Sequence, residues 1–185
     1  MKRCSWSEGH PLYIEYHDIE WGVAVHDDAK LFEFIILDGA QAGLSWLTVL
    51  KKRENYRKAF DNFDYGKIAR YNKRKVNSLL KDAGIIRNRL KVESAVTNAQ
   101  AFIKIIEEQG DFDSYIWRFV GGKTKKNAFK TLKQIPATSK ESDAMSKDLK
   151  KRGFKFVGST ICYAFMQAAG MVNDHMTSCF RYKEV

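Results

Sequence analysis

Several features that define other protein classes are scarce in this chain of 185 residues. Only 2 Pro are present, which excludes a Pro-rich low-complexity protein. The 3 cysteines are few and odd in number, which argues against a disulfide framework. No apolar run approaches the ~20 residues needed to span a bilayer, and no signal-like apolar stretch follows the first residues. We therefore expect a soluble cytoplasmic protein with no membrane partner.

Acidic residues are also in deficit. The chain has 22 Asp and Glu against 32 Lys and Arg, which gives a formal net charge of +10. A basic surface attracts polyanions, of which nucleic acid is the commonest in a cytosol. An anionic membrane surface is a rival partner, and a generally basic background is the third interpretation. The 12 Phe, 8 Tyr and 4 Trp argue against disorder and predict a folded core.

Helical periodicity dominates the chain. Apolar residues recur with a 3.6-residue repeat from Val92 to Ile106 and from Ile161 to Val172, whereas alternating strand patterns are scarce. We predict an all-α fold with one domain over residues 1–185, or two closely packed helical lobes. The other expected helices are Leu31–Leu37, Leu44–Phe60, Asp64–Tyr71, Arg74–Ala83, Asp111–Val120 and one capped by Ser142-Asp143 that runs toward Lys151. Residues 9–11, 21–28 and 121–142 are expected to be irregular.

Two cysteines and two histidines form a candidate metal site. His175 and Cys179 are four residues apart, so one helical turn would place both on one face, and Cys4 and His17 lie near the other end of the chain. Two thiolates and two imidazoles close a tetrahedral zinc shell, which would make the zinc structural and join the chain ends. The alternative is that each cysteine is a small buried apolar residue, and spacing alone does not decide. Cys162 fits the core interpretation.

Aromatic residues gather at two places: Tyr13, Tyr16 and Trp21 in a segment outside the expected helices, and Trp46 directly after the segment Gln41–Ser45. Flat rings can sandwich a nucleobase, although each could equally be ordinary core. Asp38 stands at the end of an apolar segment, directly before a glycine. It could point into a cleft and accept a hydrogen bond from an exocyclic amine, or it could cap the next helix.

A short turn between two basic helices is predicted at 83–87, with the sequence Ala-Gly-Ile-Ile-Arg. Such a turn can present backbone amides to a phosphate, as in a helix–hairpin–helix DNA anchor. Solvated helix faces explain most of the other basic clusters.

Taken together, these segments make the chain resemble the DNA-3-methyladenine glycosylase I family over nearly its whole length. The segments that carry the resemblance are Arg3-Cys4, Tyr13 to Gly22, Gln41 to Trp46, Thr48 to Tyr56, Asp82 to Arg87, Leu149 to Gly158 and Ile161 to His175. The combination is specific, whereas each segment alone is not.

The resemblance implies an all-helical fold of the helix–hairpin–helix superfamily with a structural zinc ion at its joined ends. The residues it assigns are Cys4, His17, His175 and Cys179 to zinc, Tyr13, Tyr16, Trp21 and Trp46 to a base pocket, Asp38 to recognition of the base, and Leu44 to the gap left by an extruded nucleotide. It implies hydrolysis of the N-glycosidic bond of 3-methyladenine in alkylated double-stranded DNA by a monomer. The products are the free base and an abasic site, without strand cleavage.

One departure from the family is visible. The family has Glu at the pocket carboxylate, and this chain has Asp38, which is shorter by one methylene. A misplacement of ~1 Å can cost on the order of a hundredfold in a positioned site. The family also lacks the catalytic Asp found after the hairpin in its relatives, and only Glu93 follows here. Two alternatives stay open: a non-catalytic, zinc-tied module that binds damaged DNA, and a glycosylase with a shifted base preference, for example toward 3-methylguanine.

Overall fold

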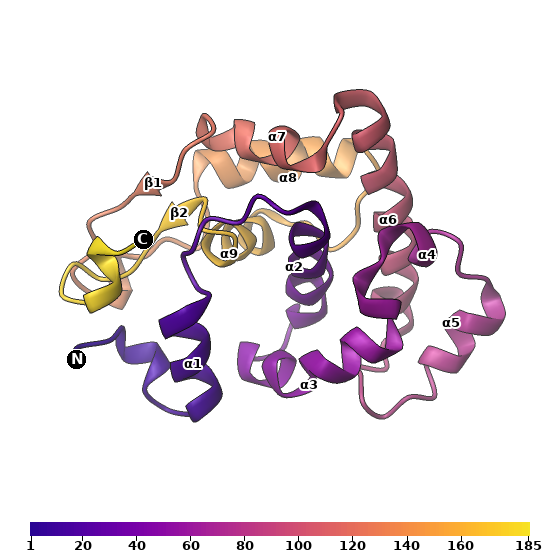
Figure 1. Ribbon diagram of the computed structural model, residues 1–185, viewed down its shortest axis with the longest axis horizontal. Helices are drawn as coiled ribbons and strands as arrows, with labels where there is room; N and C mark the ends of the chain where they lie inside the picture. The colour runs from indigo at the N-terminus through magenta and orange to yellow at the C-terminus, as the bar shows by residue number, and fades with distance from the viewer.

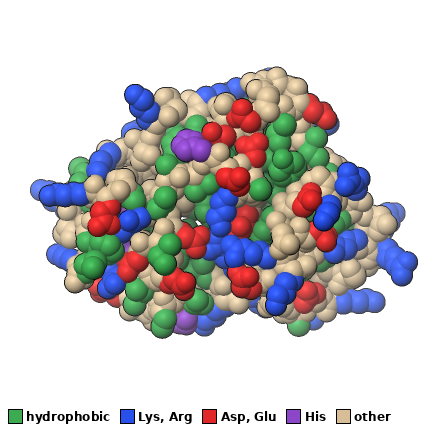
Figure 2. Space-filling view, viewed as in Figure 1, with side chains coloured by type: hydrophobic (Ala, Val, Ile, Leu, Met, Phe, Trp, Pro, Cys, Tyr) green, Lys and Arg blue, Asp and Glu red, His purple; other side chains and the backbone are tan.

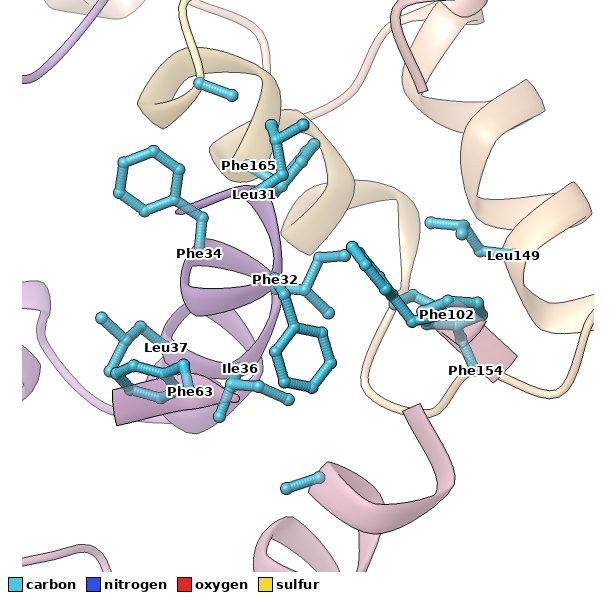
Figure 3. Packing of buried hydrophobic residues seen from close by; sticks show 14 of the residues in the cluster. Leu31, Phe32, Phe34, Ile36, Leu37, Phe63, Phe102, Leu149, Phe154 and Phe165 are labelled. Atoms are coloured by element: carbon cyan, nitrogen blue, oxygen red, sulfur yellow. The ribbon is translucent and has the colours of Figure 1, made fainter. Parts of the chain in front are cut away.

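The apolar helix α2 (Asp28–Gln41) lies at the centre of the computed structural model, which describes residues 1–185 (Figure 1). Every residue from Leu31 to Ala40 is buried, as expected of a helix surrounded by other elements. Successive residues turn by about 100°, so residues two apart lie on nearly opposite sides of the helix. Figure 3 shows Phe32 and Phe34 leaving α2 in opposite directions, and both side chains are buried.

Other helices surround α2, and the expected helical class is confirmed. They are α1 (Pro11–Ile19), α3 (Trp46–Ala59), α4 (Tyr65–Ile68), α5 (Lys73–Leu79), α6 (Arg89–Gln109), α7 (Phe112–Trp117), α8 (Lys140–Lys151) and α9 (Ser159–Ala168). The only strands are β1 (Lys125–Lys126) and β2 (Val172–Asn173), which pair in parallel. None of the helices combines the length and apolarity that crossing a membrane requires.

One continuous apolar core of 37 buried residues joins helices α2 to α9. Phe102 of α6 is at its middle, because its ring centroid lies 5.0 Å from that of Phe32 on α2 and 4.0 Å from that of Phe112 on α7. A second, smaller cluster of buried residues lies between the two chain ends: Cys4, Tyr16, Trp21, Met176 and Cys179. The N and C termini are therefore brought together in the fold (Figure 1).

Backbone contacts fix the segment after α1 to the end of α9. The amide of Gly22 donates to the carbonyl of Gln167, and the amide of Val25 donates to that of Ala169. Gly170 has φ +69°, and a Cβ there would lie 2.3 Å from the carbonyl carbon of Val23. Only glycine fits both the left-handed conformation and this close approach.

The structure corrects three expectations about the N-terminal half. Tyr13 and Tyr16 lie on helix α1, in a segment for which no helix is predicted from the sequence. His10 caps this helix and Pro11 is its first residue. Helix α2 continues through residue 39 to Gln41, so Asp38 lies inside a helix and caps nothing. Helix α3 begins at residue 46 rather than 44, because the hydroxyl of Ser45 caps it.

Two further corrections concern the C-terminal half. Helix α9 ends at Ala168, because Gly170 closes it: the amide of Met171 reaches the carbonyl of Met166, and that of Gly170 reaches Gln167. Val172 is therefore in β2, and residues 175–179 form a loop rather than a helical turn. Helix α8 is capped by Ser139 and not by residues 142–143.

Candidate functional site

A pocket of about 230 Å³ opens between α1, α2, α3 and α9. Its walls are mainly aromatic: it is lined by Trp6, Tyr13, Tyr16, Trp21, Asp38, Gln41, Trp46, Ile135, Ala164 and Gln167. The four aromatic residues and the carboxylate singled out from the sequence thus line one cavity. Its size and flat walls suit a single heterocyclic base.

The aromatic walls are held by neighbouring elements. Tyr13 and Tyr16 are three apart on α1, so they lie on one face of the helix. The hydroxyl of Tyr13 accepts a hydrogen bond of 3.0 Å from the amide of Leu47, which is in the first turn of α3 and has no partner within its helix. The rings of Tyr16 and Trp46 lie 5.4 Å apart between centroids. Helices α1 and α3 are therefore joined at the pocket.

Asp38 brings an unsatisfied carboxyl group to this pocket. The residue is 4% exposed, and its Oδ2 has no hydrogen-bond partner. Burial raises the pKa of this carboxyl well above its ordinary value, since no cation offsets it. The indole Nε1 of Trp46 is also buried without a partner. Buried polar atoms are normally paired, so two orphans on one pocket point to a bound molecule that supplies their partners.

Leu44 does not line the aromatic pocket. It lies 42% exposed in the loop after α2, where Gly43 adopts φ +77°. This loop lines an adjoining cavity of about 320 Å³ together with Asp38 and Thr160 of α9. Asp38 therefore lies between the aromatic pocket and the exposed loop.

The four candidate metal ligands converge between the chain ends. Cys4, His17, His175 and Cys179 are all buried, and their ligand atoms lie within 4.8 Å of one another. The Sγ of Cys179 is 3.4 Å from Nε2 of His17 and 3.7 Å from Nδ1 of His175, which in turn is 3.7 Å from Sγ of Cys4. A tetrahedral ion with bonds of about 2.3 Å to sulfur and 2.0 Å to nitrogen requires sulfur–nitrogen edges of about 3.5 Å. The residues fit such an ion.

Neighbouring groups orient both imidazoles. Nδ1 of His17 lies 2.8 Å from the carboxylate of Asp18, which is held by the guanidinium of Arg3. Nε2 of His175 lies 2.9 Å from the carbonyl oxygen of Trp21. Each imidazole thus turns its other nitrogen toward the cluster, as metal-binding histidines do. Burial lowers the pKa of His175 to about 4, which keeps this ring neutral and able to ligate.

Trp21 connects the candidate metal site to the pocket. Its carbonyl meets His175, its ring lies 4.6 Å from that of His175, and the same ring lines the pocket. Gly22 follows with φ +82°, and a Cβ there would lie 3.0 Å from Nε2 of His175. The pocket wall and the cluster are therefore parts of one packed unit.

A buried charge network lies behind the pocket. The guanidinium of Arg53 on α3 donates to both carboxylate oxygens of Glu20 at 2.7 Å and to Glu33 of α2 at 2.8 Å. Burial disfavours ionised Glu33, but the hydrogen bonds and charge of Arg53 outweigh it and lower the pKa of this carboxyl. Acidic and basic side chains accordingly gather over α2 and α3 at the centre of the face in Figure 2. This network ties α1, α2 and α3 together.

Sequence reasoning missed several residues of the pocket. Trp6 could have been found, because it is an aromatic residue two positions after a proposed metal ligand. Its ring lies 5.0 Å from that of Trp21. No sequence pattern marks Gln167 or Ile135 as a pocket residue. Gln167 is a polar position of an apolar helix, and Ile135 lies in a polar connection.

The turn proposed as a DNA anchor connects α5 to α6. Gly84 fits tightly in it, because a Cβ would lie 2.9 Å from Oδ1 of Asp82 and 3.1 Å from Asn55. The carbonyl of Ala83 accepts a hydrogen bond of 2.9 Å from Lys52 of α3. Arg87, before the first turn of α6, is exposed. A rigid turn beside an exposed basic helix start is suited to hold a phosphate.

Comparison with known proteins agrees with this geometry. The family model described as methyladenine glycosylase matches residues 6–182. DNA-3-methyladenine glycosylase 1 of Escherichia coli is 52% identical, over 98% of this chain and 97% of its own length. DNA-3-methyladenine glycosylase of Haemophilus influenzae is 48% identical, over 96% of each chain.

Solved structures match equally closely. A crystal structure of a 3-methyladenine DNA glycosylase I superimposes with a TM-score of 0.94 at 53% identity, covering 97% of this chain and 98% of that one. The Staphylococcus aureus enzyme, in a structure that addresses its recognition of 3-methyladenine, gives 0.94 at 35% identity and covers 97% and 96%. A family match over nearly the whole chain, relatives near 50% identity and the same fold lead to one conclusion. The chain belongs to the methyladenine glycosylase family.

Proposed function

We propose that this protein is a monofunctional DNA-3-methyladenine glycosylase that removes the damaged base from alkylated DNA. The observation that carries the proposal is the unpaired Asp38 carboxyl in an aromatic pocket beside the unpaired indole of Trp46. The relatives that align with nearly the whole chain are named for this activity. The aromatic rings would stack on a base flipped out of the duplex, and the two orphaned atoms would read its edge.

Charge explains the selectivity for the damaged base. Methylation at N3 makes adenine in DNA cationic, so its glycosidic bond is already weak and modest help suffices to break it. Asp38 would bind the amino edge of this cation as a carboxylate, because a cationic base supplies the charge partner that the free pocket lacks. Normal adenine is neutral and would leave the carboxylate uncompensated, so the pocket discriminates against it.

Water completes the reaction in this proposal. As the bond breaks, the departing base loses its charge and the sugar gains oxocarbenium character, which the DNA phosphates stabilise. Attack by water leaves an abasic site. The residues that line the pocket include no lysine, so no Schiff base is expected and the strand stays intact.

The Cys4, His17, His175 and Cys179 cluster is proposed to bind zinc. Its two thiols and two imidazoles are the donor set that Zn²⁺ prefers, and four protein ligands leave no open position for chemistry. Zinc would therefore be structural. It would fix Trp21 and α1, which together form one side of the pocket.

The remaining assignments concern DNA. We propose that the turn before α6 anchors the duplex as a helix–hairpin–helix element and that Leu44 enters the gap left by the flipped nucleotide. The net charge of +10 supports binding to the double-stranded polyanion. Residues 1–185 would act as a single monomeric domain, because one core spans α2 to α9 and Trp46 packs against both this core and the cluster at the chain ends. The domain would act in the cytoplasm, where bacterial DNA lies.

Base release from methylated duplex DNA tests this function. The protein is incubated with DNA treated with a methylating agent, and the released bases are separated by chromatography. We expect release of 3-methyladenine, while 7-methylguanine stays in place and the strands stay uncut. No release by folded, zinc-loaded protein would refute the enzyme and favour a module that only binds damaged DNA. Release of mainly 3-methylguanine would show that the shorter Asp38 has shifted the base preference.

A further inference from the structure

A half-buried lysine joins the start of α6 to the end of α2. Nζ of Lys91 donates hydrogen bonds to the carbonyl oxygens of Ala40 at 2.8 Å and Ala42 at 2.6 Å. The last carbonyls of a helix have no partner within it, and a cation is favourable at that end. No carboxylate forms an ion pair with Lys91, so its ammonium group is committed to these carbonyls.

The carbonyls that Lys91 holds begin the loop that carries Leu44. Ala42 ends α2, Gly43 turns the chain with φ +77°, and Leu44 follows as an exposed apolar residue. The amide of Leu44 returns to the carbonyl of Gln41 at 2.6 Å, which makes a tight turn. An exposed turn of this kind has few packing contacts of its own, so Lys91 is a principal restraint on its position.

The other end of this connection is the turn at 83–88. Lys91 is the third residue of α6, and Asn88 caps that helix directly after the turn. Arg87 and Arg89 flank the cap and are exposed. The Lys91 side chain therefore links the basic helix start, where a phosphate would bind, to the exposed leucine that precedes α3.

We propose that Lys91 is a positioning residue that holds the Leu44 loop in register with the DNA-binding turn before α6. This inference rests on the proposed function. With the loop fixed in advance, binding of the backbone phosphates places Leu44 beside the damaged nucleotide without a further ordering cost. Lys91 does not line the aromatic pocket, so it acts on engagement of duplex DNA rather than on recognition of the free base.

The test compares Lys91→Met with Lys104→Met. Methionine keeps an unbranched apolar stem but removes the ammonium group, and Lys104 is an exposed lysine of the same helix. Three quantities are measured: the affinity for free 3-methyladenine, kcat/KM on methylated duplex DNA, and hydrogen exchange of the Leu44 amide. For Lys91→Met we expect an unchanged affinity for the base, a loss of about tenfold or more in kcat/KM, and exchange faster by about tenfold. Lys91→Arg should restore most of both losses, and Lys104→Met should match the unaltered protein.

Each contrary result overturns the proposal in its own way. Unchanged exchange at Leu44 in Lys91→Met would show that the lysine does not hold the loop, even if activity fell. Faster exchange with unchanged kcat/KM would show that the loop need not be held. An equal loss of free-base affinity would reveal a general defect of the fold. If the unaltered protein released no base at all, the proposed function would fail, whereas the exchange comparison would still decide the role of Lys91 in the loop.

Discussion

Replacing Asp38 by Asn should stabilise the folded protein while it damages the site. Burial raises the pKa of Asp38 well above its ordinary value, so the folded protein keeps the proton of this carboxyl to a higher pH than the unfolded chain does. Below the unfolded pKa of about 3.9 both states carry the proton. As the pH rises further, the unfolded chain releases its proton and the folded chain does not, so stability falls until the folded pKa is reached. Asn does not titrate, so the stability of Asp38→Asn does not fall in this way as the pH rises.

The size of the effect follows from linkage. The unaltered protein should lose about 1.4 kcal/mol for each pH unit between the unfolded and folded pKa values of Asp38, relative to Asp38→Asn. For a chain of this length, that corresponds to about 3–6 °C in Tm per pH unit. Both side chains leave one buried polar group unpaired, so the two proteins should differ little near pH 4. Other carboxylates titrate identically in both proteins and cancel.

Thermal unfolding of the two proteins between pH 4 and pH 8 measures this difference. We expect a Tm advantage for Asp38→Asn that is small at pH 4 and grows as the pH rises toward the folded-state pKa of Asp38. A Tm difference that stays constant with pH would refute it, because Asp38 would then titrate alike in both states. A larger advantage at low pH would mean that an unseen cation stabilises the carboxylate.

The other predictions concern the proposed zinc site and the charge network. Cys179→Ser should lower both the zinc content, measured by elemental analysis, and the Tm, whereas Cys162→Ser should leave the zinc content unchanged; a stable, metal-free Cys179→Ser protein would contradict the zinc site. Arg53→Met should cost about 3–5 kcal/mol in the free energy of unfolding, because it leaves the buried Glu33 carboxylate undercompensated. Denaturant unfolding measures this loss, and it should shrink at low pH, where Glu33 is protonated in both states; a loss independent of pH would show that packing alone is responsible.

The periodicity of apolar residues predicts the long amphipathic helices of the core, because the buried residues of such a helix lie on one face. The spacing from Val92 to Ile106 predicts α6, which the structure has at Arg89–Gln109. Helix α1 was not found because it is buried on two sides: Tyr13 and Tyr16 face the pocket while His17 faces the metal cluster, so no single apolar stripe is visible. A helix that serves two sites lacks the simple pattern of a surface helix.

Glycines misled the local interpretation in both halves of the chain. Gly39 follows the end of the expected helix Leu31–Leu37, but it lies within α2, where a Cβ would meet that of Phe156 at 3.3 Å, so it serves close packing. Gly170 lies within the apolar repeat from Ile161 to Val172, yet it ends α9 and sends the chain into β2 and the loop that holds His175 and Cys179. The candidate ligand set can be proposed from residue types, whereas its loop geometry depends on this tertiary contact.

The polar atoms left unpaired in the pocket could not be read from the sequence. Asp38 had two local interpretations, and only the packing of α2 against α9 shows that its Oδ2 has no partner. Lys91 likewise was one basic residue among many until its contacts with the end of α2 were visible. Functions that depend on what a group fails to contact require the three-dimensional structure.

The most direct test of the site is a titration of free 3-methyladenine into the protein, followed by the fluorescence of the pocket tryptophans. We expect saturable binding to the unaltered protein and an affinity weaker by about tenfold in Asp38→Ala, since the hydrogen bond between the carboxyl group and the base is lost. Equal affinity of the two proteins would contradict the central claim that the unpaired Asp38 carboxyl reads the base.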